Sequence, residues 1–97
     1  MKQAVDILKD LVAIPSVSSQ SNRPVIDYAH RKLDAKAWKI RLHPYVDPAG
    51  VDKVNLVALT GREPAELALV CHTDTVPFAS DWKEAVHPRV RDGKLYG

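Results

Sequence analysis

The stretch LALVCHTDTVPF, residues 67–78, decides how this sequence is interpreted. Five apolar residues, 67–71, lead directly into His72, and Asp74 follows after one intervening residue. Because the apolar run does not alternate with polar residues, it predicts a strand that is covered on both faces, in the centre of an α/β sheet. Side chains two positions apart on a strand point to the same side, so His72 and Asp74 are expected to project together.

A histidine and an aspartate at the carboxyl end of a central strand suit a ligand site, because α/β sheets form their crevices there. A neutral imidazole at His72 can bind a metal ion through one ring nitrogen, and its other N–H then needs an acceptor. A carboxylate at Asp74 supplies that acceptor and fixes the imidazole. The spacing predicts a metal ligand with its orienting carboxylate; the alternative is a polar pair that caps the strand or starts a turn.

The residues before this stretch predict two helices. Apolar residues at helical spacing predict a helix over residues 3–13, which ends before Pro15. A second helix is expected to start after Asn22, the candidate N-cap, with Pro24 in its first turn. This helix is expected to run to about Lys36 and to turn its apolar residues inward.

Three strands and a hairpin turn are expected after the helices. Alternating apolar and charged residues predict a half-buried strand over 38–46, and an apolar run predicts a second strand over 54–60. The third strand is 67–72, and the sequence DGKL at 92–95 predicts a hairpin turn. The order of elements favours an α/β sandwich with a mixed sheet in which the third strand is central.

The composition sets limits on size and partners. The 97 residues are 45% apolar and 27% charged, which is an ordinary globular balance for one domain or part of one. The net charge is +2 and the basic residues are scattered, so neither nucleic acid nor a membrane surface is expected as a partner. No apolar run approaches the ~20 residues that span a bilayer. The single cysteine excludes an internal disulfide and fits a reducing cytoplasm.

Several motifs together resemble a family of dizinc deacetylases and peptidases. The resemblance rests on ILKDLVAIPSVS at 7–18, CHTDTVP at 71–77, Trp82, the His-Pro pair at 87–88, and DGKLYG at 92–97. These motifs are spread over nearly the whole sequence. Because the sequence stops where a strand has just begun, we interpret residues 1–97 as the N-terminal part of a longer protein of this kind.

The resemblance implies a zinc-peptidase-like α/β/α sandwich and a site that holds two Zn²⁺ or Co²⁺ ions. In this family the histidine of the His-x-Asp motif binds one metal and the aspartate orients it, which corresponds to His72 and Asp74. The resemblance also implies that the bridging aspartate, the general-base glutamate and the other ligands lie beyond Gly97. Residues 1–97 would then be part of the metal-binding catalytic domain, and a separate lid domain would form a homodimer.

The motifs look closest to family members that remove the acetyl group from N2-acetyl-L-ornithine, giving ornithine and acetate in arginine biosynthesis in the cytoplasm. The substrate would be a small N-acylated amino acid. Two related activities share the same front part, namely removal of succinate from succinyl-diaminopimelate and cleavage of dipeptides. A non-enzymatic alternative is a binding module that keeps the fold and has lost catalysis.

Two places depart from the family, and four other residues are expected to have ordinary structural roles. After Trp82 the family usually has an acidic or similar residue, proline and phenylalanine, where this sequence has His87, Pro88 and Arg89, so the rim of the pocket is expected to differ. The family commonly has glycine where this sequence has Ala37, and a left-handed alanine would cost roughly 1 kcal/mol, so a local rearrangement is expected there. Cys71 is expected on the face opposite His72, as a small core residue. His30 is expected on a solvated helix face. His43 and His87 each precede a proline in a loop or at a strand edge and are not expected to contact substrate.

Overall fold

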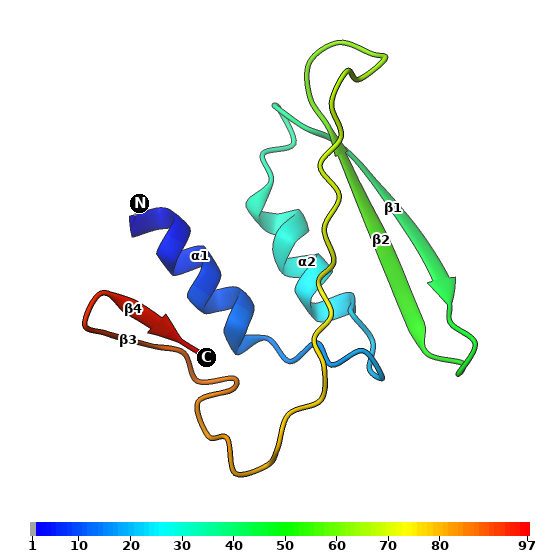
Figure 1. Ribbon diagram of the computed structural model, residues 1–97. Coiled ribbons are helices and arrows are strands. Elements are labelled where there is room, and N and C mark those ends of the chain that lie inside the picture. Colours follow the sequence, from blue (N-terminus) through cyan, green and yellow to red (C-terminus); the bar gives the residue numbers. More distant parts are fainter. Residues whose placement is uncertain (1) are drawn as a thin grey trace.

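The computed structural model describes residues 2–97 and contains two helices followed by two hairpins (Figure 1). The elements are α1 (Lys2–Ala13), α2 (Arg23–Lys32), β1 (Lys39–Val46), β2 (Asp52–Leu59), β3 (Arg89–Arg91) and β4 (Lys94–Tyr96). β1 pairs with β2 and β3 with β4, both antiparallel, so the sheets are separate. The fold is a small mixed α/β arrangement, as predicted at that level, whereas a sandwich around one mixed sheet is not confirmed.

The start of α2 agrees with the sequence prediction in position but not in contacts. The helix begins directly after Asn22 and has Pro24 in its first turn. The Asn22 side chain makes no capping bond to the helix. Its Nδ2 donates to the Val54 carbonyl at 2.8 Å, and its Oδ1 accepts from the Val54 amide at 2.9 Å. The predicted side-chain cap is therefore wrong, and Asn22 instead joins the start of α2 to strand β2.

The end of α2 differs from the sequence prediction. The helix ends at Lys32 and not near Lys36, and Leu33 is already extended. A turn follows in which Oδ1 of Asp34 accepts from the Lys36 amide at 2.9 Å. Ala37 does not adopt the left-handed conformation, since Asp92 is the one non-glycine residue with positive φ in the described part of the chain. Ala37 therefore carries no left-handed strain, and the expected rearrangement relative to the family stays a prediction.

The core lies between α2 and β2. Val25 and Ile26 from α2 pack against Val54, which is fully buried in β2. Half-buried apolar residues pack around this centre, namely Leu11, Ile14, Leu42 and Leu56. The predicted inward face of the second helix is therefore confirmed at its two most buried positions. The core is small, so each of its contacts contributes a large share of the stability.

Tyr28 connects the two helices. Its hydroxyl donates a hydrogen bond of 2.7 Å to Oδ2 of Asp10 in α1. Burial raises the pKa of Tyr28 to about 12, and the hydrogen bond to the Asp10 carboxylate and the negative charge of that carboxylate act in the same direction. The folded chain therefore favours the neutral phenol more strongly than the unfolded chain does.

This pKa shift predicts a loss of stability at alkaline pH. The unfolded phenol ionises near its usual value of 10.0 and the folded one near 12, so the contribution of Tyr28 is complete below pH 10 and is lost as the pH rises toward 12. The melting-temperature difference between the unmodified chain and Tyr28→Phe should therefore shrink over this range. Tyr45→Phe is the matched control, because Tyr45 is 47% exposed. A difference for Tyr28→Phe that stays constant from pH 9 to pH 12 would contradict the coupling.

The strands predicted over 38–46 and 54–60 are present as β1 and β2, which form a hairpin, and the hairpin turn predicted at 92–95 is confirmed. In the first, Lys39 lies opposite Leu59, and Oδ1 of Asp47 accepts from two backbone amides of the connecting turn. In the second, Asp92 and Gly93 both have positive φ, 49° and 72°. Two such residues in sequence match the mirror-image turn that suits the twist of a hairpin.

The segment 67–72 differs most from the prediction. It is extended but forms no ladder with any described strand, and it runs as a single thread between the two hairpins (Figure 1). Leu69 is 90% exposed and Val70 is 93% exposed, so the expected central, covered strand is wrong. Cys71 is exposed as well and is not a core residue. An apolar run favours a strand, but a strand exists only when a partner supplies its hydrogen bonds.

The structure also bears on membrane insertion. Within residues 2–97, neither helix combines the length and the apolar character that a membrane span requires.

Candidate functional site

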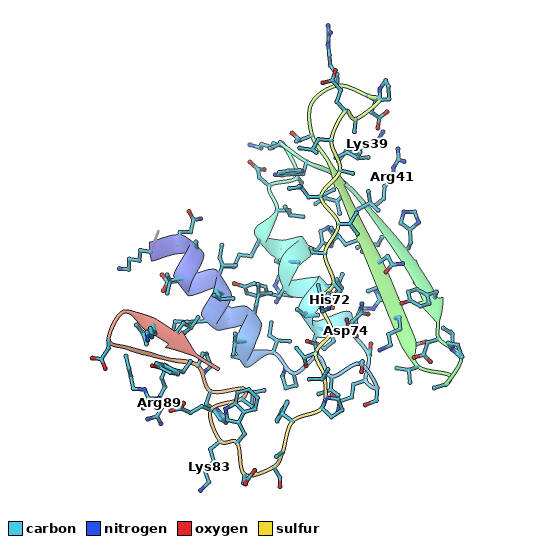
Figure 2. All side chains as sticks on the ribbon, viewed as in Figure 1. Lys39, Arg41, His72, Asp74, Lys83 and Arg89 are labelled. Carbon is cyan, nitrogen blue, oxygen red and sulfur yellow. The ribbon has the colours of Figure 1, made fainter. Side chains whose placement is uncertain are left out.

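The structure brings His72 and Asp74 together on the extended segment (Figure 2). Nδ1 of His72 lies 3.0 Å from Oδ1 of Asp74 and 3.0 Å from the Asp74 backbone oxygen. Since both neighbours are acceptors, a proton on Nδ1 can be shared between them. Contact with a carboxylate favours the tautomer with the proton on Nδ1, which leaves Nε2 with its lone pair free.

This arrangement fits one ligand of a metal site. A metal-binding histidine usually donates its other ring N–H to a carboxylate or carbonyl, and His72 has both within reach. The side chain of His72 is 85% exposed, so Nε2 is open to an incoming ion. Within the described part of the chain, no three His, Cys, Asp or Glu residues gather closely enough to hold an ion. The predicted roles of His72 and Asp74 stay predictions.

A short parallel contact with the segment between the helices supports the pair. Val17 and Thr75 form an isolated parallel bridge. The Thr75 amide donates to the Ser16 carbonyl at 3.0 Å, and the Ser18 amide donates to the Thr75 carbonyl at 3.0 Å. The hydroxyl of Ser16 donates to the Thr73 carbonyl at 2.8 Å. These hydrogen bonds hold the backbone on both sides of Asp74, at Thr73 and at Thr75.

An apolar groove of about 480 Å³ runs beside this segment, along the end of α1. Its lining includes His72, Phe78 and Trp82, and the two aromatic rings meet edge to face with centroids 6.2 Å apart. The ring of Trp82 packs against Phe78 and remains 51% exposed. A groove that opens next to a potential metal ligand could receive the apolar part of a small molecule.

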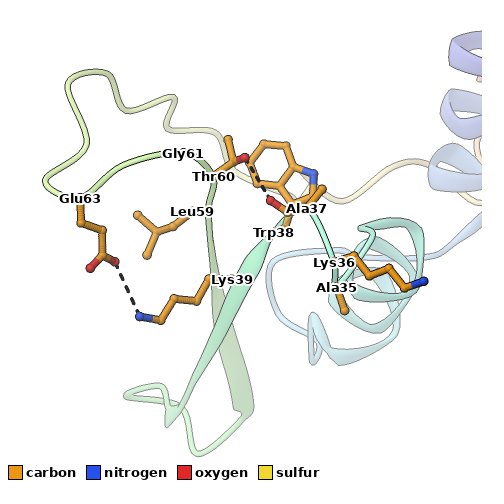
Figure 3. Close-up of a pocket in the computed structure, with 9 residues that line it drawn as sticks. All are labelled: Ala35, Lys36, Ala37, Trp38, Lys39, Leu59, Thr60, Gly61 and Glu63. Atoms are coloured by element: carbon orange, nitrogen blue, oxygen red, sulfur yellow. Dashed lines mark hydrogen bonds and ion pairs between the residues drawn. The ribbon is translucent and has the colours of Figure 1, made fainter.

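A second hollow, of about 610 Å³, lies between the turn that follows α2 and the adjacent ends of β1 and β2 (Figure 3). The hydroxyl of Thr60 donates to the Ala37 carbonyl at 3.0 Å, and Lys39 lies 3.8 Å from Glu63. Lys39 and Glu63 are both more than half exposed, and an ion pair of that kind contributes little. This hollow holds neither His72 nor Asp74, so it is not the candidate site.

The other histidines lie outside the candidate site, and two buried polar residues close to it were not identified from the sequence. His30 is exposed, as expected of a solvated helix face, and His43 and His87 are exposed as well. Sequence reasoning did not identify Ser16 or Lys53, which are 6% and 7% exposed. Nζ of Lys53 donates to the Ser18 carbonyl at 2.7 Å and to the Gln20 carbonyl. Lys53 lies just before the predicted strand 54–60, and no local pattern marks it as buried, because the carbonyls that accept from its ammonium are 35 and 33 positions away in the sequence.

Comparison with known proteins supports the resemblance seen in the motifs. The chain is 42% identical to the acetylornithine deacetylase of Myxococcus xanthus over 92 residues, which are 92% of this chain and 24% of that protein. It is 37% identical to the acetylornithine deacetylase of Photorhabdus laumondii and 33% identical to that of Proteus mirabilis. Each of these two matches covers 96% of this chain and 26% of the relative.

The predicted similarity is therefore confirmed: this chain resembles acetylornithine deacetylases along almost its whole length. The chain spans about a quarter of the length of these curated relatives. No family model matches the chain, and no solved structure matches it.

Proposed function

We propose that this chain contributes one metal-binding histidine, His72, and its orienting carboxylate, Asp74, to the active site of a metal-dependent amide hydrolase. The proposed substrate is N2-acetyl-L-ornithine. The observation that carries the proposal is the contact between His72 and Asp74, 3.0 Å between Nδ1 and Oδ1, which leaves Nε2 open. The similarity to proteins named acetylornithine deacetylase supports the choice of reaction and substrate. The reaction would release ornithine and acetate, as a step in arginine biosynthesis.

The chain's own residues would act on the position of the metal. His72 would hold one Zn²⁺ or Co²⁺ ion through Nε2. Asp74 would accept the hydrogen bond from Nδ1, which fixes the orientation of the ring and makes Nε2 more basic. When bound, the metal pair supplies an activated water and polarises the amide carbonyl. The apolar groove beside His72 would keep bulk water from one side of the substrate. The remaining ligands and the general base belong to the rest of the active site.

The proposal also covers the cellular compartment and the oligomeric state. The exposed, unpaired Cys71 fits a reducing cytoplasm, where a free thiol persists. We propose a homodimer for the complete protein, on the family resemblance.

Hydrolysis assays test the proposal. A protein of the relatives' length that carries this chain should hydrolyse N2-acetyl-L-ornithine when zinc or cobalt is added, and should lose that activity to a chelator. The 97-residue chain alone should give no turnover above a metal-only blank, because a zinc site needs about three or four protein ligands. Succinyl-diaminopimelate and a dipeptide are the comparison substrates. Faster turnover of either would replace the proposed substrate, and metal-independent binding without turnover would favour a binding module.

A further inference from the structure

We infer that Ser16 is a positioning residue for the His72–Asp74 pair, with Lys53 holding the segment on which Ser16 lies. The inference rests on the proposed function, since it assigns the pair a geometry that serves metal binding. Ser16 touches neither His72 nor Asp74 through its hydroxyl. It acts through the backbone of Thr73, the residue between them.

The hydroxyl of Ser16 fixes the peptide group that links the two members of the pair. It donates to the Thr73 carbonyl at 2.8 Å, and the plane of that carbonyl also contains the amide of Asp74. One residue further on, the Thr75 amide donates to the Ser16 carbonyl at 3.0 Å. Ser16 therefore contacts the chain on both sides of Asp74, and these contacts set the direction in which the carboxylate leaves the backbone.

Packing does not hold the pair, so these hydrogen bonds carry most of the restraint. The side chain of His72 is 85% exposed and that of Asp74 is 48% exposed. The residues leading into the pair form no ladder, and Val70 is 93% exposed. Ser16, in contrast, is 6% exposed, so its hydroxyl is held in one place by its surroundings. A buried hydroxyl that donates to a carbonyl with no other restraint fixes the orientation of that carbonyl.

Strand β2 holds the segment that carries Ser16. Nζ of Lys53 donates to the carbonyls of Ser18 and Gln20, and Asn22 exchanges two hydrogen bonds with Val54. Lys53 is 7% exposed, so its ammonium depends on these carbonyls in place of water. The core strand β2 is thereby connected to the candidate metal ligand through the backbone of residues 16–22.

The test compares Ser16→Ala with Ser19→Ala in the full 97-residue chain, labelled with ¹⁵N and kept at concentrations where light scattering shows a monomer. Ser19 is exposed and lies in the same segment, so it is a matched serine control. Ring-nitrogen chemical shifts of His72 report its tautomer without any metal. Zinc chloride alone is then titrated, and its dissociation constant at His72 is read from the same signals.

Ser16→Ala should lower the fraction of the Nδ1–H tautomer, speed the exchange of the Thr75 amide, and weaken zinc binding at His72 by about 3- to 10-fold. This range is below the 10- to 100-fold typical of losing a direct partner of the ligand, because Ser16 acts through one more contact. Ser19→Ala should change none of the three. Values for Ser16→Ala equal to those of the unmodified chain would overturn the inference.

Two further outcomes distinguish a failure of this inference from a failure of the proposed function. If zinc perturbs His72 in no variant of this chain, which lacks the other ligands, the inference is judged by the tautomer and the Thr75 exchange alone, and the proposed metal role is judged by the hydrolysis assays. If Ser16→Ala does not fold, Ser16→Thr replaces it, since threonine keeps the hydroxyl. A folded Ser16→Thr chain that retains the tautomer and the zinc affinity supports the inference, and one that loses both overturns it.

Discussion

Replacing His72 by alanine should abolish most of the hydrolase activity of a protein of the relatives' length that carries this chain. The variant removes the one imidazole in the described residues that already has a carboxylate at its other nitrogen, 3.0 Å away. An ion that loses one of about three or four protein ligands is held poorly, so both metal content and rate should fall. Metal content by elemental analysis and the rate at saturating zinc measure the two effects.

His87→Ala is the matched control, because His87 is also an exposed histidine and lies outside the pair. It should change neither metal content nor rate. Equal losses for His72→Ala and His87→Ala, or full activity of His72→Ala, would show that His72 binds no catalytic metal.

Asp74→Ala should have a smaller effect of a different kind. The imidazole remains, but its Nδ1–H loses the carboxylate that fixes the ring. The metal affinity should weaken by about 10- to 100-fold, and saturating zinc should restore much of the metal content. Asp81→Ala removes an exposed aspartate nearby and is the control. Unchanged affinity and rate in Asp74→Ala would reduce Asp74 to a turn residue.

The second large effect concerns the apolar segment that enters the site. The 97-residue chain should self-associate in a concentration-dependent manner, because Leu67, Leu69 and Val70 are 77%, 90% and 93% exposed. Fully burying a side chain of this size is worth about 1.5–3 kcal/mol, and the extended backbone of the same segment offers unpaired hydrogen-bonding groups to another strand. Light scattering coupled to size-exclusion chromatography over a range of concentrations measures the association.

A charge in the segment should reverse that association. Leu69→Lys should shift the chain toward the monomer, since a lysine interrupts an exposed apolar edge. Val46→Lys adds the same charge at an apolar residue of β1 that is 63% exposed, and it should leave the association largely unchanged. A monodisperse monomer for the unmodified chain at every concentration would show that the segment is covered in solution.

The local elements could be predicted because their determinants are close together in the sequence. Apolar spacing places α1 over Lys2–Ala13, and Pro24 marks the first turn of α2. The pair Asp92–Gly93 specifies the last hairpin through its backbone conformation.

Predictions that needed a distant partner were less successful. The run 67–71 has the composition of a buried strand, yet no described strand pairs with it, so composition alone could not decide its burial. Asn22 has the residue type of a helix cap, but the Val54 backbone lies within reach and takes both of its hydrogen bonds. In each case the missing information was which groups lie nearby in space.

The sequence by itself determined the helices, the two hairpins and the proximity of His72 to Asp74, because two residues of extended backbone already place those side chains on one side. The tertiary structure alone decided what holds the pair. Ser16 is 57 positions from Thr73, and no local pattern relates a serine hydroxyl to a carbonyl so far along the chain. That contact exists because β2, through Lys53 and Asn22, holds residues 16–22 beside the segment that carries His72.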